Sequence, residues 1–139
     1  MASANTAPIF VANVTGKGAT WTNSDAANTK KVISPTIGAN GARIHFINAT
    51  SSDTSARDFN LYLNDGTTDF LIGAFTVTVG AGTSGAIASV CVSALNTQLP
   101  FLASDGSLLI PAGWSLKAEN AAQVTSAKSV AITVIGGDY

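Results

Sequence analysis

Few side chains in this 139-residue chain could support acid–base, nucleophilic or metal chemistry. His45 is the single histidine and Cys91 the single cysteine. A zinc site of the usual kind needs three or four His and Cys ligands, so one chain cannot build it. No G-x-S-x-G sequence is present to present a serine nucleophile. We therefore expect His45 to be a packed or surface residue, and Cys91, between Val90 and Val92, to be a buried small hydrophobe.

The acidic residues are spread along the chain. Asp65 and Asp105 each precede a glycine in a predicted turn, where a carboxylate caps backbone N–H groups. Asp53, Asp58 and Asp69 could meet at the ends of a predicted hairpin and bind a cation, but their spacing matches no calcium loop. We therefore expect no catalytic residue, no metal site and no cofactor. A hydrolase with an unrecognised site is the weakest of the functions considered.

The composition favours contacts with other proteins. Charged residues make up only 11% of the chain, whereas roughly 25% is usual for soluble domains. Ser, Thr and Asn supply the polarity instead, and they hydrogen-bond at packed interfaces without the desolvation cost of charges. Nucleic-acid binding needs a dense basic footprint, and Lys30-Lys31 is the only adjacent basic pair. We therefore expect no nucleic-acid partner.

The sequence also argues against a membrane or secretory role. No run approaches the roughly 18 apolar residues of a membrane span. The N-terminal residues lack a basic stretch followed by a long apolar core, so they do not match a secretory signal. A single cysteine excludes an intrachain disulfide, which fits assembly in a reducing cytoplasm.

Residues 57–75, RDFNLYLNDGTTDFLIGAF, give the clearest structural signal. Phe59, Leu61 and Leu63 alternate with mostly polar residues, as in a half-buried strand. Asn64-Asp65-Gly66 can adopt the positive φ of a tight turn, and a second apolar run follows at 70–75. The pattern predicts an antiparallel hairpin near the middle of the core.

The other segments read as short strands separated by turns. Eight to ten strands are expected, with turn signals every 8–12 residues and at most one helical turn. We predict strands at 9–11, 19–22, 31–37, 43–49, 76–79, 108–110, 114–118 and 130–135, and a strand passing into a short helical turn within 86–99. The strand predicted at 43–49 should place Ile44 and Phe46 on one face. Residues 16–18 are predicted to be a turn, and residues 48–56 and 80–85 surface loops.

These elements predict an all-β fold, an antiparallel β-sandwich of jelly-roll or Greek-key type, with the jelly roll preferred. Residues 1–8 are interpreted as a flexible N-terminal arm and 9–139 as a single sandwich domain. Trp114 follows Gly113 at an inward position, so core packing is expected for it. For Trp21 the core and an interface remain equally open.

From about Asn60 onward the chain resembles small structural proteins of tailed bacteriophages. The resemblance lies in LYLNDGTTDFLIGAFTV, in VSALNTQLPFLASDGSLLIPAGWSLKAENA and in the terminal GGDY. It is similar to capsid cement, or decoration, proteins with a jelly-roll fold from short-tailed phages. The resemblance implies a non-enzymatic virion protein, made in the host bacterial cytoplasm, that binds the outside of an assembled head and bridges neighbouring major capsid subunits.

Under this interpretation the partners are the major capsid protein and other copies of the chain. A dimer is favoured over a trimer because two-fold homo-oligomers are the commonest. The N-terminal arm and the loops at 48–56 and 80–85 are expected to contact capsid or sister copies. The interface candidates are Pro8, Phe10, Trp21, Asn48, Thr50, Thr83 and Tyr139. The alternative is a carbohydrate- or receptor-binding sandwich of a tail fibre or spike, with exposed aromatic residues in a groove and no affinity for heads.

Overall fold

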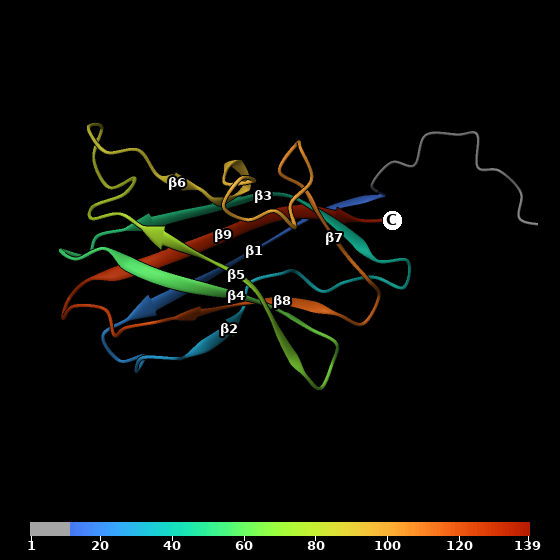
Figure 1. Ribbon diagram of the computed structural model, residues 1–139, viewed down its shortest axis with the longest axis horizontal. Coiled ribbons are helices and arrows are strands. Elements are labelled where there is room, and N and C mark those ends of the chain that lie inside the picture. Colours follow the sequence, from blue (N-terminus) through green and yellow to red (C-terminus); the bar gives the residue numbers. More distant parts are fainter. Residues whose placement is uncertain (1–11) are drawn as a thin grey trace, which may run out of the picture.

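The computed structural model describes residues 12–139 and shows two antiparallel β-sheets packed against each other (Figure 1). Sheet A has the strand order β1-β9-β3-β6, with β7 also paired to β3, and sheet B has the order β2-β8-β4-β5. The strands are β1 (Asn13–Thr22), β2 (Lys30–Val32), β3 (Ala42–Ser51), β4 (Arg57–Asn64), β5 (Asp69–Val77), β6 (Val90–Cys91), β7 (Leu108–Ile110), β8 (Ser115–Asn120) and β9 (Ser129–Asp138).

The strand pairing is that of a jelly roll. The chain behaves as one long antiparallel hairpin, in which β4 pairs with β5, β3 with β6 and β7, β2 with β8, and β1 with β9. These pairs fall alternately in sheet B and sheet A, so the hairpin is wrapped around a single core. Two Greek keys in two sheets define the jelly roll, and the expected fold class is confirmed.

The core forms because inward positions alternate along each strand. On β9 the inward residues Val130, Ile132 and Val134 are fully buried, as the sequence pattern predicted. They face aromatic residues from the other sheet, with Phe59 on β4 and Phe75 on β5 stacked at 5.9 Å between ring centroids. The two sheets therefore share one hydrophobic cluster.

Helical structure in residues 12–139 is confined to one 3-10 turn, η1 (Val92–Ala94). It follows directly after β6, which confirms the predicted strand passing into a short helical turn. No helix in this described part of the chain is long and apolar enough to cross a membrane.

The turn predicted at residues 16–18 is wrong. Gly16 and Gly18 lie inside β1, where they pair with Ile135 and Thr133 of β9. Ten consecutive pairs with β9 hold this strand extended, and such a distant partner cannot be seen in the local sequence. The strand predicted at 9–11 lies outside the described residues.

The facing predicted for β3 is also wrong. Ile44 pairs with Gly136 and Phe46 pairs with Ile135, so His45 is an extra residue in a β-bulge. The bulge turns Ile44 inward and leaves both His45 and Phe46 exposed. His45 is thus a surface residue, one of the two environments expected for it.

Residues 48–56 are not a continuous surface loop. β3 continues to Ser51, which is buried, and Asp53 beyond it is also buried. Only residues 52–56, between the end of β3 and the start of β4, connect sheet A to sheet B. The longer strand places Asn48 and Thr50 on the outer surface of sheet A.

The predicted central hairpin is confirmed as β4 and β5, but its position differs. β5 is an edge strand of sheet B, so its residues Phe70 and Leu71 are exposed. The turn chemistry follows the prediction, because Asp65 Oδ1 accepts hydrogen bonds from the N–H groups of Thr67 and Thr68. Asp105 caps the N–H of Ser107 in the same way.

Candidate protein-interaction surface

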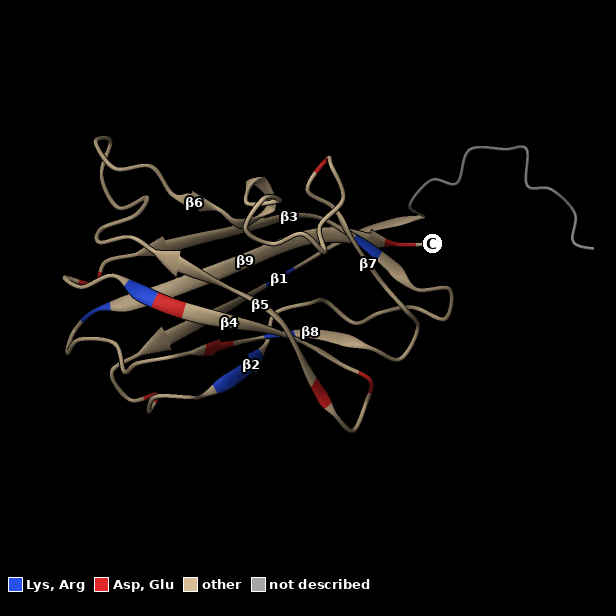
Figure 2. Ribbon diagram, in the orientation of Figure 1, with Lys and Arg blue, Asp and Glu red and all other residues tan. Residues whose placement is uncertain are grey.

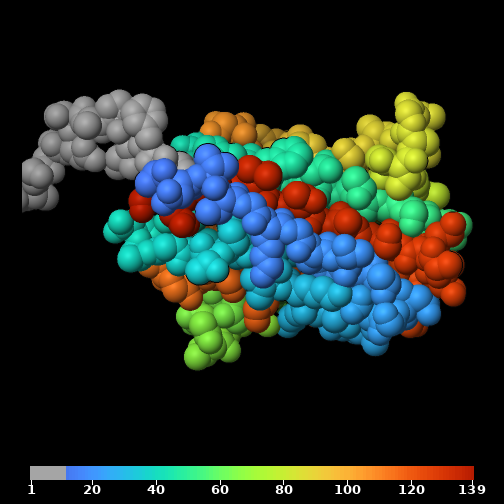
Figure 3. Space-filling model, turned by 180° about the vertical axis from the view of Figure 1, so that it is seen from behind, coloured from blue at the N-terminus to red at the C-terminus, as the bar shows by residue number. Residues whose placement is uncertain are grey.

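The outer face of sheet A, called here the sheet A face, is the broadest regular surface formed by the described strands. Figure 3 shows β3, β9 and β1 side by side on it as green, red and blue bands. Period-two alternation and the strand register assign its side chains. They are Val14, Gly16, Gly18 and Thr20 of β1, Ala131, Thr133, Ile135 and Gly137 of β9, Arg43, Phe46, Asn48 and Thr50 of β3, Cys91 of β6 and Leu109 of β7.

The sheet A face divides into two parts along its strands. The first, the apolar half, lies at the end where β1 begins, and its large side chains are exposed: Val14 is 81% exposed, Leu109 64%, and Phe46 and Ile135 each 40%. The second, the small-polar half, lies at the opposite end and contains only small or uncharged polar residues. Its members are Gly18, Thr20, Asn48, Thr50, Ala131 and Thr133.

Formal charge is nearly absent from this face. Among the described residues it carries one charged side chain, Arg43, whose guanidinium is paired with Asp105 and also donates to Ser107 Oγ at 3.0 Å. Figure 2 shows that the strand charges gather instead on β2, β4, β5 and β8. Two faces of one sandwich therefore have different surface chemistry.

The outer face of sheet B holds a closed network of charges. Asp69 Oδ2 accepts from Lys30 Nζ at 3.1 Å, and Asp69 Oδ1 lies 3.0 Å from Lys117 Nζ. Lys30 also lies over the ring of Tyr62, 4.3 Å from its centroid, and the Tyr62 hydroxyl is 3.1 Å from a carboxylate oxygen of Glu119. These groups satisfy one another, so the network braces the sheet rather than presenting free charges to a ligand.

The network perturbs its own ionisable groups. A hydrogen bond from Asn64, with those from Lys117 and Lys30, lowers the pKa of Asp69 to about 2. The hydrogen bond to Asp69 raises the pKa of Lys30. Both pKa shifts favour the charged forms of Asp69 and Lys30 and so stabilise the ion pair between them.

Two hollows lie in the apolar half, one on each side of Leu109 and Tyr139. The first has a volume of about 430 Å³ and is lined mainly by apolar side chains together with Arg43; its walls include Phe101, Leu102 and Leu108. The second, of about 250 Å³, lies toward Ile110 and Pro111. Leu109 therefore stands as a ridge between two concave patches.

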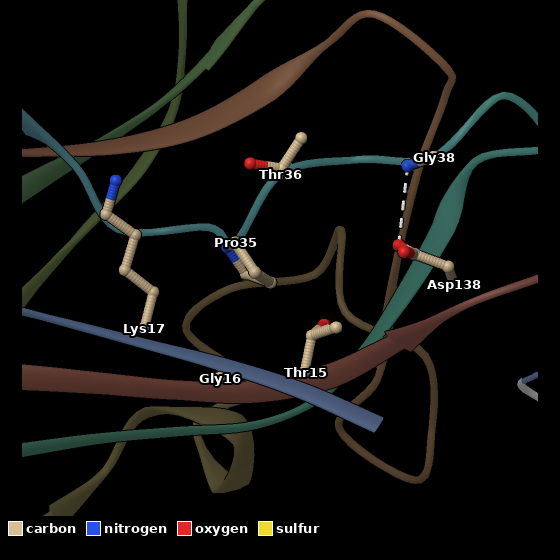
Figure 4. Close-up of a pocket in the computed structure, with 7 residues that line it drawn as sticks. All are labelled: Thr15, Gly16, Lys17, Pro35, Thr36, Gly38 and Asp138. Carbon is tan, nitrogen blue, oxygen red and sulfur yellow. Dashed lines mark hydrogen bonds between the residues drawn. The ribbon is translucent and has the colours of Figure 1, made fainter. Parts of the chain in front are cut away.

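A third hollow, of about 520 Å³, lies between β1 and the connection from β2 to β3 (Figure 4). Thr15, Gly16 and Lys17 form one wall, and the N–H of Gly38 donates to Asp138 Oδ1 at 3.4 Å on the other. Among the described residues that line this open hollow, Lys17 and Asp138 are the only ionisable side chains, and no nucleophile is paired with a base there.

Three of the sequence-predicted interface residues lie on the sheet A face, at opposite ends of it. Asn48 and Thr50 lie in its small-polar half, and Tyr139 lines the hollows of its apolar half. Thr83 is exposed in the long connection from β5 to β6. Pro8 and Phe10 lie outside the described residues.

Trp21 was an interface candidate and is instead a core residue. It is fully buried, and its indole Nε1–H donates to the carbonyl of Thr29 at 3.0 Å. Trp114 is only half-buried, and its ring stacks on Phe70 with the centroids 6.1 Å apart. Trp21 thus takes the core position, one of the two left open for it, and Trp114 is partly buried and packs against the core.

Cys91 is exposed, so its predicted burial is wrong. It pairs with Asn48, which points outward, and it therefore shares the outer face. Val14 and Leu109 each lie within an apolar or glycine-rich run, so only the register with a neighbouring strand shows that their side chains point outward. The outward position of Ile135 follows from the alternation of Val130, Ile132 and Val134 along β9.

The three acidic residues considered for a cation site do not meet. Asp53 pairs with Arg57, Asp58 accepts from Thr76, and Asp69 lies at the opposite end of the β4–β5 hairpin. Within residues 12–139 no group of three or more His, Cys, Asp or Glu side chains is placed to hold a metal ion.

Comparison of the chain with protein-family models and with curated proteins gave no match.

Proposed function

We propose that this protein is a structural virion protein that binds the outside of an assembled phage head and cements neighbouring major capsid subunits. The observation that supports the proposal best is the small-polar half of the sheet A face. It is free of charge, and it carries the hydroxyl and amide groups of Thr133, Asn48 and Thr50. Such a surface suits docking onto protein, because its groups can be desolvated and re-paired at lower cost than charges.

The connection between β5 and β6 extends this surface. Residues 82–89 are all exposed and none is charged, while the base of the loop is fixed to sheet A by the hydrogen bond from Ser51 N–H to Ala81 O at 2.8 Å. Gly82 approaches Thr50 so closely that a Cβ there would meet its methyl group. Figures 1 and 3 show the loop standing out at one end of the sandwich. Long loops on rigid scaffolds commonly carry binding contacts.

Cementing follows from mass action. A protein that binds the assembled lattice but not free subunits stabilises the lattice by RT ln(1 + [L]/Kd), about 2.7 kcal/mol per site at a concentration 100 times Kd. No catalytic group is needed for this. A rigid body contacting two capsid subunits at once is sufficient.

The proposal is tested by co-sedimentation of the purified protein with undecorated heads. Thr133→Lys places an unpaired charge in the centre of the small-polar half and should weaken head binding at least tenfold. The matched control is Ala74→Lys, which adds the same charge on the exposed edge strand of sheet B and should bind as the wild type does. Equal binding by both variants would remove the sheet A face from the docking surface.

The same assay addresses the alternative function. A tail-fibre or spike module would not bind heads at any concentration, and it would bind host glycans instead. Retention of the wild-type protein on immobilised host-surface glycans, with no sedimentation on heads, would replace the cement function by that alternative.

A further inference from the structure

The apolar half of the sheet A face remains unused by the docking proposed above. Its most exposed large residues are Val14 and Leu109, and the hollow beside β7 lies next to Leu109. We propose that this half binds the same surface of a second copy of the chain, with Leu109 of each copy entering the hollow of the other. This pairing does not depend on head binding.

A surface can bind a second copy of itself when it carries both a projecting side chain and a hollow that can receive that side chain. Leu109 stands outward from β7 because its neighbours Leu108 and Ile110 point into the core. The adjacent hollow of about 430 Å³ has Phe101 and Leu102 in its wall, so a leucine side chain entering it would bury apolar surface against them. In a two-fold pair the same patch serves as both partners, and each copy offers one projection and one hollow.

The charges of the surface permit this pairing. Arg43 lines the hollow, and its charge is offset within the same copy by Asp105. Two copies therefore meet without like-charge repulsion. The Nε–H of Arg43 is also buried and has no acceptor among the described residues, and an unsatisfied buried donor gains from a new acceptor at an interface.

The area of the patch sets the strength of the pairing. Three strands contributing about five residues each and the three-residue β7, about 4.8 Å apart with a rise of about 3.3 Å per residue, give roughly 300 Å² per copy. A stable interface buries about 800 Å² per partner, so the pair should be weak in free solution.

The test is sedimentation equilibrium of the full chain from about 10 μM to 1 mM, where weak pairs of this size dissociate. The wild-type average mass should rise toward that of a dimer over this range. Leu109→Asp should weaken association at least tenfold. Leu71→Asp is the matched control, because Leu71 is 62% exposed, close to the 64% of Leu109, but lies on the edge strand of sheet B. It should associate as the wild type does.

Val14→Asp gives a second, independent variant, since Val14 is the most exposed large hydrophobic side chain of the described residues and lies on another strand of the same half. It too should shift the equilibrium toward monomer, and thermal unfolding would verify that all three variants remain folded. A wild-type chain that stays monomeric at 1 mM would overturn the proposal. So would equal loss of association in the Leu109→Asp and Leu71→Asp variants. Neither result bears on head binding, which the Thr133→Lys variant tests separately.

Discussion

The indole ring of Trp21 meets the ring of Phe59 edge-on, with 4.9 Å between the centroids and 75° between the planes. Trp21 belongs to β1 of sheet A and Phe59 to β4 of sheet B, so this contact joins the two layers of the sandwich. Edge-to-face pairs add to the free energy of burial. The rigidity of both outer faces depends on such contacts between the sheets.

Replacement of Trp21 by alanine should lower the free energy of unfolding by about 3–5 kcal/mol, because it leaves a large cavity and removes the ring pair. Urea denaturation measures the change. Trp114→Ala is the control, since Trp114 is only half-buried, and it should cost clearly less. Equal losses would mean that the inter-sheet contact has no special weight.

The buried Asp53 ties the corner after β3 to the loop before β9. Its Oδ2 accepts from Arg57 Nε at 2.6 Å, and its Oδ1 accepts from Thr125 Oγ1 at 2.6 Å. Burial alone would raise the pKa of Asp53, but the hydrogen bonds from Arg57 and Thr125 outweigh it and hold that pKa well below its usual range. Asp53→Ala should cost about 3–5 kcal/mol because it leaves Arg57 unpaired. Asp58→Asn, at an exposed site on the same strand as Arg57, should change the unfolding free energy little.

Asp69 should make the stability dependent on pH in the acid range. Its pKa is about 2 in the folded chain against 3.8 for the free side chain. A lowered folded-state pKa means that its contribution is present above pH 3.8 and is lost as the pH falls toward 2. Urea midpoints measured from pH 6 down to pH 2 should fall more steeply for the wild type than for Asp69→Asn. Parallel curves for the two proteins would contradict this assignment.

Alanine substitution at Gly106 and at Gly113 should show how much unfolding free energy is lost to backbone strain alone and how much to a steric clash. Gly106 and Gly113 have φ of 81° and 78°, but a Cβ on Gly106 would strike the backbone of Ser93, whereas a Cβ on Gly113 would meet open space. Gly113→Ala should cost about 1 kcal/mol from the left-handed backbone alone. Gly106→Ala should cost at least twice as much, as thermal unfolding can show. Equal shifts would mean that the Ser93 segment moves aside freely.

Features that depend on neighbouring residues were predicted well. The β4–β5 hairpin and the capping carboxylates of Asp65 and Asp105 follow from turn chemistry within a few residues. The inward residues of β9 follow from strict alternation. These signals were sufficient for an all-β sandwich, because the strand count and turn spacing leave few other architectures.

Features set by distant partners were missed. The bulge at His45 exists because β3 must match β9, and the extended Gly16–Gly18 region exists because β9 pairs along the whole of β1. The exposure of Cys91 depends on its pairing with Asn48. For the same reason the sequence indicated only isolated interface candidates, whereas the placement of Asn48, Thr50 and Tyr139 on one sparsely charged face required the register of five strands.

The central claim is that this protein binds assembled heads rather than isolated capsid subunits. Sedimentation with undecorated heads, run beside dissociated major capsid protein at the same subunit concentration, tests it most directly. The account predicts saturable binding to the heads, no complex with the dissociated subunits, and heads that release their DNA at a higher temperature once decorated. Equal affinity for free subunits, or no binding to heads at saturating protein, would contradict it.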